Sequence, residues 1–410
     1  MTSEKIESAR TDGLPDHIRM TSAGRLVLTG GAHNVAHLFS GKHVPAPSAV
    51  AAFRANHLAR RKWCAARRIR FSQWVFPDAI VLAGLADDDG MTPTHGLDLS
   101  QVRSIYETHF RFAGDVADVH YPLELLQHHP ERQTLTDSHY SDLGNLHLAA
   151  EVARIMHGSQ DLEHVAARAA LARPAEITGD LGVQCTPQRR EDRLRLPPPE
   201  QRLIASNGLA AGNNGIIFLL ENKVPSGTGT VLIFGDSFFR CLLDELIAYW
   251  DAIVFVRSSY FHYELVAAVQ PAAILTGMAE RYIAAQVPDD RRPHVLALPL
   301  NAGRAQSPDP GFSQMWTRLI DQPALARMQE DALPVTGTAP RPGTGMTETQ
   351  ILEQTAFALW RMREGDASGL EGAARSALWV KARQGYLDEA RVLLDIMIAR
   401  GLRISGAGRS

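Results

Sequence analysis

An acid and a histidine stand two residues apart in the stretch TLTDSHYSDLG, residues 134–144. A histidine beside a carboxylate can take a proton from a hydroxyl, because the acid orients the ring and stabilises its charged form. Asp137 and His139 are therefore candidates for the orienting acid and the general base of an acyl-transfer or hydrolytic site. The chain has sixteen histidines, so a surface-turn histidine beside a helix-capping aspartate is the alternative.

The candidate nucleophile is Ser237, in the stretch IFGDSFF. The serine follows the apolar run TVLIF, which is typical of a buried parallel strand, and precedes FFRCLLDELIAYW, which has the period of a helix. Gly235 and Asp236 allow a tight strand-to-helix turn, and the first N–H groups of the helix could stabilise an oxyanion. The alternative is that Ser237 is only a helix cap.

The surrounding elements predict an α/β domain. From Thr230 to Tyr282 the pattern is strand, helix, strand, helix, strand, which predicts parallel strands with right-handed crossovers. Upstream, RLVLTGG and FSQWVFPD are expected strands on either side of a helix, and residues 145–172 are expected to hold two helices. The stretch RREDRLRLPPPEQR is expected to be a surface loop or an irregular insertion, and NGLAAGNNGIIFLLEN stays undecided. The fold class is a doubly wound parallel sheet in three layers, with a small C-terminal helical unit.

The 410 residues divide into four expected parts. Residues 1–20 are a flexible N-terminal segment, 21–332 the α/β domain, 333–348 a linker rich in Pro, Gly and Thr, and 349–410 a helical unit. Within the last part, GYLDEA, residues 385–390, resembles the inter-helix turn of a tetratricopeptide repeat, and a generic αα-hairpin is the alternative. Apolar residues at helical spacing there need a partner surface, which predicts a protein partner or a homo-oligomer.

Composition excludes several classes of protein. A net charge of −3 gives no support for a nucleic-acid or membrane-surface partner, and three dispersed cysteines support neither disulfides nor a zinc ribbon. A metal site built from His128, His129, His139 and His147 fits no standard zinc spacing, so neither metal nor cofactor is expected. The chain has no apolar signal region and no apolar run of transmembrane length, which predicts a cytoplasmic location.

The order of the two motifs indicates a family. An Asp-x-His motif upstream of Gly-Asp-Ser, with GMAERY after it, resembles the SGNH-type domains of the alginate O-acetyltransferase proteins. The resemblance runs from about Arg25 to Tyr282. It implies an SGNH-like fold and, because that family acts outside the cytoplasm, a periplasmic location as the alternative.

The resemblance also implies roles for individual residues. Ser237 would be the nucleophile, His139 the general base, Asp137 its orienting acid, and Asp236 a structural residue. Tyr140 stands where the family often carries tryptophan, and could stack on a sugar. The candidates for contacts with the oxyanion or the substrate are Gly235, Asp236, Tyr140, Arg257 and Arg281. For Arg281, a salt bridge with Glu280 that holds the strand end is the expected default.

The candidate residues and the family resemblance together predict one of two functions. The first is a serine-dependent O-acyltransferase or esterase that uses an acyl donor and a carbohydrate acceptor through an acyl-Ser237 intermediate. The second is a non-catalytic glycan-binding or scaffold protein with an SGNH fold, whose helical tail binds a partner.

Overall fold

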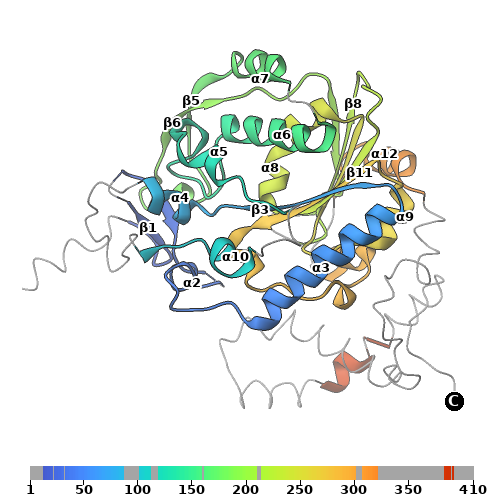
Figure 1. Cartoon of the computed structure of the whole chain (residues 1–410), viewed down its shortest axis with the longest axis horizontal. Helices are drawn as coiled ribbons and strands as arrows, with labels where there is room; N and C mark the ends of the chain where they lie inside the picture. The colour runs from blue at the N-terminus through green and yellow to red at the C-terminus, as the bar shows by residue number, and fades with distance from the viewer. Residues whose placement is uncertain are drawn as a thin grey trace, which may run out of the picture. The chain divides into compact units, whose positions relative to one another are not determined.

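The described part of residues 1–333 folds around a seven-stranded mixed β-sheet with helices on both faces (Figure 1). The computed structural model describes residues 13–21, 23–31, 33–86, 101–111, 119–158, 161–209, 214–301, 307–321, 383–388 and 390–391. The strands are β1 (Ile18–Met20), β2 (Leu26–Leu28), β3 (Arg70–Phe76), β4 (Val119–His120), β5 (Arg173–Ile177), β6 (Glu191–Arg195), β7 (Arg202–Ser206), β8 (Ile217–Asn222), β9 (Thr230–Gly235), β10 (Ala252–Arg257) and β11 (Ala273–Ala279).

The helices connect these strands. The α-helices are α2 (Val35–Phe39), α3 (Pro47–Ala66), α4 (Ala79–Ala86), α5 (Leu123–Gln127), α6 (Asp142–His157), α7 (Leu162–Ala169), α8 (Ser237–Leu246), α9 (Tyr263–Val269), α10 (Glu280–Ile283), α11 (Leu298–Asn301) and α12 (Phe312–Leu319). Single turns of other helix types are η2 (Tyr106–Phe110), η3 (Pro130–Arg132), η4 (Gly182–Gln184), η5 (Ile247–Tyr249), η6 (Asp289–Arg291) and η7 (Val295–Ala297).

The main sheet is mostly parallel. Its order is β4-β3-β11-β9-β10-β8-β7. The first five strands are mutually parallel, whereas β8 and β7 add an antiparallel edge. The three strands β9, β10 and β11 are apolar and buried along nearly their whole length, as expected for strands covered on both faces.

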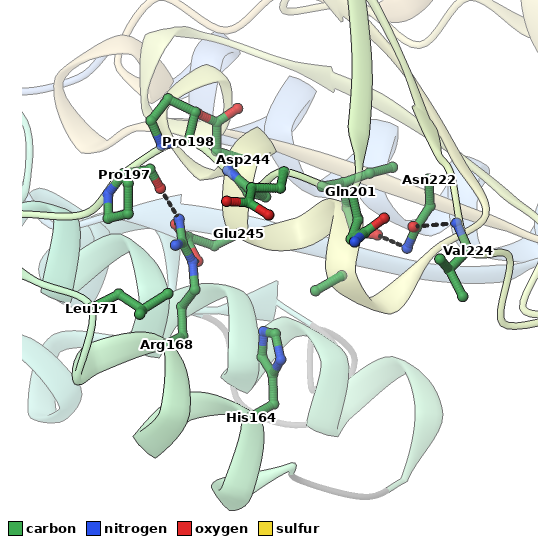
Figure 2. Close-up of a pocket in the computed structure, with 14 residues that line it drawn as sticks. His164, Arg168, Leu171, Pro197, Pro198, Gln201, Asn222, Val224, Asp244 and Glu245 are labelled. Atoms are coloured by element: carbon green, nitrogen blue, oxygen red, sulfur yellow. Dashed lines mark hydrogen bonds and ion pairs between the residues drawn. The ribbon is translucent and has the colours of Figure 1, made fainter.

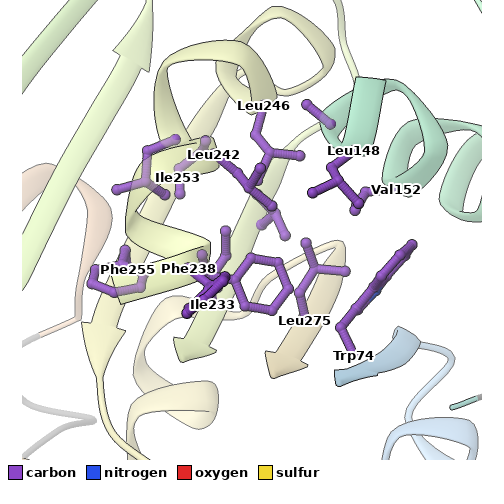
Figure 3. Packing of buried hydrophobic residues seen from close by; sticks show 14 of the residues in the cluster. Trp74, Leu148, Val152, Ile233, Phe238, Leu242, Leu246, Ile253, Phe255 and Leu275 are labelled. Atoms are coloured by element: carbon purple, nitrogen blue, oxygen red, sulfur yellow. The ribbon is translucent and has the colours of Figure 1, made fainter. Parts of the chain in front are cut away.

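The expected βαβαβ unit is confirmed as β9-α8-β10-α9-β11. Helix α8 packs with α6 on one face of the sheet, and α9 packs with α3 on the other (Figure 1). Figure 3 shows the first core, with side chains from α6, α8 and the strands in contact: Trp74, Leu148, Val152, Ile233, Phe238, Leu242, Leu246 and Leu275. The prediction of an α/β fold with a mostly parallel sheet between two helical layers is therefore confirmed, with the antiparallel edge as a departure.

Other expectations at the level of elements were right in part or wrong. RLVLTGG does contain a strand, β2, but it pairs with β1 in a separate two-stranded sheet. Residues 18–20, expected to be flexible, are therefore part of a strand. RREDRLRL is not a loop, because β6 pairs with β5 in an antiparallel ladder. The undecided stretch contains β8, which pairs with β10 and β7.

The chain divides into two compact units, residues 1–333 and 334–410. The expected linker lies outside the described residues, and so does most of the expected C-terminal helical unit. Within GYLDEA, the described residues 385–388 are helical, and the tetratricopeptide-like hairpin is not supported. Among the described helices, none combines the length and the apolar character needed to cross a membrane.

Candidate active site

The candidate site lies at the carboxyl edge of the parallel strands. Gly235, Arg257 and Gly277 occupy equivalent positions on β9, β10 and β11, so the residues that follow these strands come together at one edge. This edge is where open α/β sheets bind their ligands. A Cβ atom on Gly235 would lie 3.0 Å from the carbonyl oxygen of Gly277 and 2.8 Å from the ring of Phe239. Gly235 therefore allows the strand to pass closely beside its neighbour just before Asp236.

Asp236 ties two strand ends together. Its Oδ1 accepts a hydrogen bond from the backbone N–H of Phe238 at 2.9 Å and caps α8, while its Oδ2 accepts from the N–H of Ala279 at 2.7 Å. Burial raises the pKa of Asp236, although these backbone hydrogen bonds and the charge of Arg281 act against the rise. Both carboxylate oxygens are used within the protein, as a structural role requires.

Ser237 is the first residue of α8 and is 8% exposed. Its hydroxyl makes no hydrogen bond within the described part of the chain. The hydroxyl lies at the N-terminus of α8, where backbone N–H groups and the helix dipole favour negative charge.

Asp137 and His139 form a hydrogen-bonded pair in the turn before α6. Oδ1 of Asp137 lies 2.8 Å from Nδ1 of His139 and 3.0 Å from its backbone nitrogen. The Thr134 hydroxyl lies 2.8 Å from the carbonyl oxygens of both residues and closes the turn. Burial alone would favour the neutral acid, but the hydrogen bonds and charge of His139 outweigh it and lower the pKa of Asp137 to about 2. The carboxylate is therefore charged and holds the Nδ1–H tautomer of the ring.

The second nitrogen of His139 has no partner. Nε2 is buried and makes no hydrogen bond to any described residue. The ring lies 5.0 Å, centroid to centroid, from the ring of Phe238, the residue next to Ser237. The structure thus brings the histidine to the start of α8, but the expected hydrogen bond between His139 and Ser237 is not formed. A buried ring nitrogen without a partner costs free energy unless a ligand or a small movement supplies one.

Asp180 is a third member of this cluster that the sequence did not reveal. Its two oxygens accept hydrogen bonds from the N–H and the hydroxyl of Ser138, at 2.7 and 2.6 Å. Oδ2 also lies 3.7 Å from Nδ1 of His139. Burial and the nearby charge of Asp137 raise the pKa of Asp180. No local spacing could signal this residue, because it comes from a loop about 40 positions further along the chain.

The cluster has donor atoms of the kind that bind metals. One oxygen or nitrogen from each of Asp137, His139 and Asp180 lies within 4.8 Å of the others. In the structure, however, Nδ1 is engaged by Asp137 and the oxygens of Asp180 by Ser138. These hydrogen bonds are those of an acid–histidine pair held in a fixed orientation. The four-histidine cluster considered above is not formed among the described residues, since only His139 belongs to a group with ligand spacing.

Tyr140 is placed for packing. It is 5% exposed, its hydroxyl donates to the carbonyl oxygen of Pro77 at 2.7 Å, and its ring meets that of Phe238 at 5.1 Å in an edge contact. A sugar-stacking residue needs an open ring face, so the expected stacking role does not fit this position.

The expected Glu280–Arg281 salt bridge was wrong. Arg281 instead donates to Asp78 at 2.7 Å, with both side chains buried, and its guanidinium lies 5.6 Å from the ring centre of Phe238. Despite burial, the charge of Asp78 raises the pKa of Arg281. Glu280 and Arg281 are the first two residues of α10, and neighbouring residues of a helix do not face each other, so the two charges have separate partners.

Glu280 is fully buried among neutral donors. It accepts hydrogen bonds from the Ser104 hydroxyl at 2.6 Å, the Tyr106 N–H at 2.9 Å and the Tyr121 hydroxyl at 2.7 Å. Burial raises its pKa to about 7, although the three hydrogen bonds lower it. The residue anchors the end of β11 to the segment around η2.

Two cavities share part of their lining, and the first of them adjoins the acid–histidine pair. One, of about 500 Å³, is lined by Asp137, His139, Asp180 and four arginines, which are Arg193, Arg195, Arg202 and Arg240. The other, also about 500 Å³, is drawn in Figure 2, where Arg168 extends toward Glu245 and the carbonyl of Pro197. Pro197, Pro198, Asp244 and Glu245 line both cavities. The buried Arg168–Glu245 ion pair, at 2.9 Å, fixes the wall between them.

A third cavity, of about 290 Å³, opens at the ends of β9 and β10. Gly235, Asp236 and Arg257 contribute to its lining, so three of the expected site residues meet there. Ser237 is not part of the lining of any of these three cavities.

Comparisons with known proteins find no matching family model and no matching curated protein. Solved structures do resemble the chain. A DHHW family protein from Eubacterium siraeum is 12% identical, with 60% of this chain and 91% of that chain covered and a TM-score of 0.41. PatB1 of Bacillus cereus, with a sulfonyl adduct, is 8% identical over 65% and 97% of the chains, with a TM-score of 0.44. The O-acetyltransferase domain of Pseudomonas putida AlgJ is 10% identical over 69% and 98%, with a TM-score of 0.35. Likeness at this level does not define the family of the chain.

Proposed function

We propose that the chain is an SGNH-type, serine-dependent O-acyltransferase or esterase that acts on a carbohydrate hydroxyl through an acyl-Ser237 intermediate. The observation that carries the proposal is the state of His139. Nδ1 is held by a charged carboxylate at 2.8 Å, and Nε2 is buried without a partner beside the residue that follows Ser237. A general base needs one nitrogen fixed and the other free to accept a proton.

In the proposed reaction, Oγ of Ser237 attacks the carbonyl carbon of an acyl donor while Nε2 of His139 takes its proton. Asp137 stabilises the imidazolium that results. The N–H of Phe238 is occupied by Asp236, so the N–H of Ser237 and the field of the α8 N-terminus are assigned to the oxyanion. Collapse of the intermediate expels the donor alcohol, which takes the proton from His139.

The acceptor then reacts with acyl-Ser237. A sugar hydroxyl, or water in the esterase case, loses its proton to Nε2 and attacks the carbonyl carbon of the ester. The bond between that carbon and Oγ of Ser237 then breaks, and Oγ takes the proton back from His139. The cavity of about 500 Å³ next to His139 is lined by carboxylates and arginines, which are the groups that hydrogen-bond to sugar hydroxyls. Three of its arginines already pair with carboxylates: Arg193 with Glu191, Arg195 with Asp142 and Arg202 with Asp244. Such pairing holds the polar groups in fixed positions before a substrate binds.

The test is chemical. Wild-type protein should cleave p-nitrophenyl acetate and become covalently labelled at Ser237 by a fluorophosphonate. Ser237→Ala should abolish that label, and His139→Ala should reduce labelling by about a thousandfold or more, since triad members act as a unit. Circular dichroism should show both variants folded. A wild type in which Ser237 is never acylated or labelled would contradict the proposal.

The second candidate is a glycan-binding protein that keeps this fold without catalysis. The missing hydrogen bond between His139 and Ser237 favours it. In that case oligosaccharide binding would be measurable by calorimetry, and His139→Ala would leave the affinity unchanged in the absence of any ester cleavage. We likewise propose a cytoplasmic or, alternatively, a periplasmic location. For the C-terminal residues we propose a protein partner or a second copy of the chain.

A further inference from the structure

A complete serine–histidine–carboxylate array is present at a second position of the same sheet edge. Oγ of Ser258 lies 2.8 Å from Nε2 of His262, and Nδ1 of His262 lies 3.2 Å from Oε1 of Glu264. We propose that Ser258 is a second acyl-accepting serine, activated by His262 and Glu264. Unlike the pair of His139 and Ser237, this array has both of its hydrogen bonds formed.

The array is built by a short stretch of sequence, residues 257–264. Ser258 directly follows β10, and its N–H donates to the carbonyl oxygen of Gly235 at 3.1 Å, which fixes it beside the end of β9. His262 occupies the position just before α9, and Glu264 stands in the first turn of that helix. The spacing of serine, histidine and glutamate at i, i+4 and i+6 brings them together only because the chain turns between β10 and α9.

Glu264 is held as a charged acceptor. Its Oε1 accepts from the N–H of Val295 at 3.0 Å, and its Oε2 accepts from Nε and Nη2 of Arg292 at 3.2 Å each. Burial alone would raise the pKa of Glu264, but the hydrogen bond and charge of His262 and the charge of Arg292 lower it to about 2. With an ionised acceptor at Oε1, Nδ1 of His262 carries the hydrogen.

This tautomer determines the donor and the acceptor of each remaining hydrogen bond. Because Nδ1 of His262 donates, Nε2 is the acceptor, and the hydroxyl of Ser258 donates to it. Oγ of Ser258 in turn accepts from the N–H of Tyr260 at 3.1 Å. The serine hydrogen therefore already points to the base that would remove it, which is the arrangement that activates a serine nucleophile.

Ser258 also faces a space in which an ester could bind. Together with Arg257, Asp236 and His33, it lines the cavity of about 290 Å³. His262 is 0% exposed, Glu264 2% and Ser258 4%, so the array is almost closed to bulk water. Arg257 places a positive charge on the wall of the same cavity, which suits a developing oxyanion. The volume fits a short acyl ester and leaves no room for a polysaccharide.

The acyl donor of the proposed reaction is an ester or a thioester. Oγ of Ser258 forms a bond to the carbonyl carbon, and its proton moves to Nε2 of His262. The bond to the leaving alkoxide or thiolate breaks, and that group takes the proton from His262. An acceptor hydroxyl or water later attacks acyl-Ser258, gives its proton to Nε2, and the proton returns to Oγ as the acyl group departs.

The two histidines pack against different cores, on different faces of the sheet. His139 packs on Phe238 of α8, on the side of α6, whereas the ring of His262 lies 5.5 Å from that of Phe234 in the core beneath α9. This inference does not depend on the proposed role of Ser237, because neither His139 nor Asp137 takes part in it.

The experiment is covalent labelling of the full chain by the small reagent diethyl fluorophosphate, in parallel with acetyl trapping from p-nitrophenyl acetate. Adducts are mapped by peptide mass spectrometry. In Ser237→Ala, we expect an adduct on Ser258 and at least tenfold less on Ser259. Ser259 lines the same cavity, but among the described residues no histidine forms a hydrogen bond with its hydroxyl. Ser259 is thus a control inside the same peptide.

Glu264→Gln should slow labelling of Ser258 at least tenfold, and Ser258→Ala should remove it, while Ser259→Ala should leave it unchanged. If Glu264→Gln does not fold, the ratio of Ser258 to Ser259 adducts in Ser237→Ala still tests whether Ser258 is activated. Absence of both adducts from Ser258, or equal labelling of Ser258 and Ser259, would overturn the inference. A label on Ser258 with none on Ser237 in the wild type would instead overturn the function proposed for Ser237.

Discussion

The imidazole of His139 is fixed at one nitrogen and open at the other. Asp137 binds Nδ1 directly, and Asp180 holds Ser138, the residue between them. The ring is thus positioned by its own turn before any substrate binds. Because the ring lies 5.0 Å, centroid to centroid, from that of Phe238, Nε2 is held near the start of α8, where Ser237 stands.

Replacement of the orienting acid tests this geometry. In Asp137→Asn, the side-chain amide can donate to Nδ1, which favours the ring tautomer whose Nε2 carries hydrogen and cannot act as a base. We expect the rate of Ser237 labelling and of ester cleavage to fall by about 10²–10⁴. Asp142→Asn is the matched control, since Asp142 lines the same cavity but pairs with Arg195. Equal rates in the two variants would contradict the role of Asp137.

At the scale of elements, Glu280 joins the end of β11 to the segment around η2 through a buried carboxyl group. Its pKa of about 7 lies above the ordinary value of 4.5, so the folded protein keeps the proton to a higher pH than the unfolded chain does. Stability from this group is therefore present at low pH and is lost as the pH rises from about 4.5 to 7.

Glu280→Gln removes that titration and keeps the shape of the side chain. Between pH 5 and 7, the free energy of unfolding of the wild type should fall relative to that of the variant, by up to about 3 kcal/mol. Urea unfolding at several pH values measures the difference. Parallel curves for the two proteins would show that the group has no raised pKa.

The elements differ in how well the sequence predicts them, and burial explains the difference. TVLIF, AIVFV and AAILTG are apolar because both faces of each strand are covered, and all three were predicted correctly. EDRLR in β6 is largely exposed and charged, and it forms a strand only because β5 pairs with it. The same contrast holds in the site. A two-residue spacing revealed Asp137 and His139, whereas Asp180 and the partner of Arg281, Asp78, depend on how distant segments fold together.

At the scale of the whole molecule, every described residue of the candidate site lies in the compact unit of residues 1–333. Asp78, Asp236, Ser237 and Arg281 follow strands β3, β9 and β11 at one edge, and the turn before α6 supplies the acid and the base. Each contact that positions them joins described residues before position 334. From these contacts, we expect the chemistry proposed for Ser237 to proceed without residues 334–410.

A chain that ends at Leu333 should accordingly keep its activity. We expect its rate of fluorophosphonate labelling at Ser237 to stay within about twofold of the full chain, because the turn, the sheet edge and α8 are all retained. If residues 334–410 bind a partner or a second copy, size-exclusion chromatography with light scattering should show a change in assembly between the two chains. The Asp137→Asn substitution, introduced into the shortened chain, should reduce labelling by the same factor as in the full chain. A shortened chain that is folded by circular dichroism but no longer labelled would place part of the active site in residues 334–410.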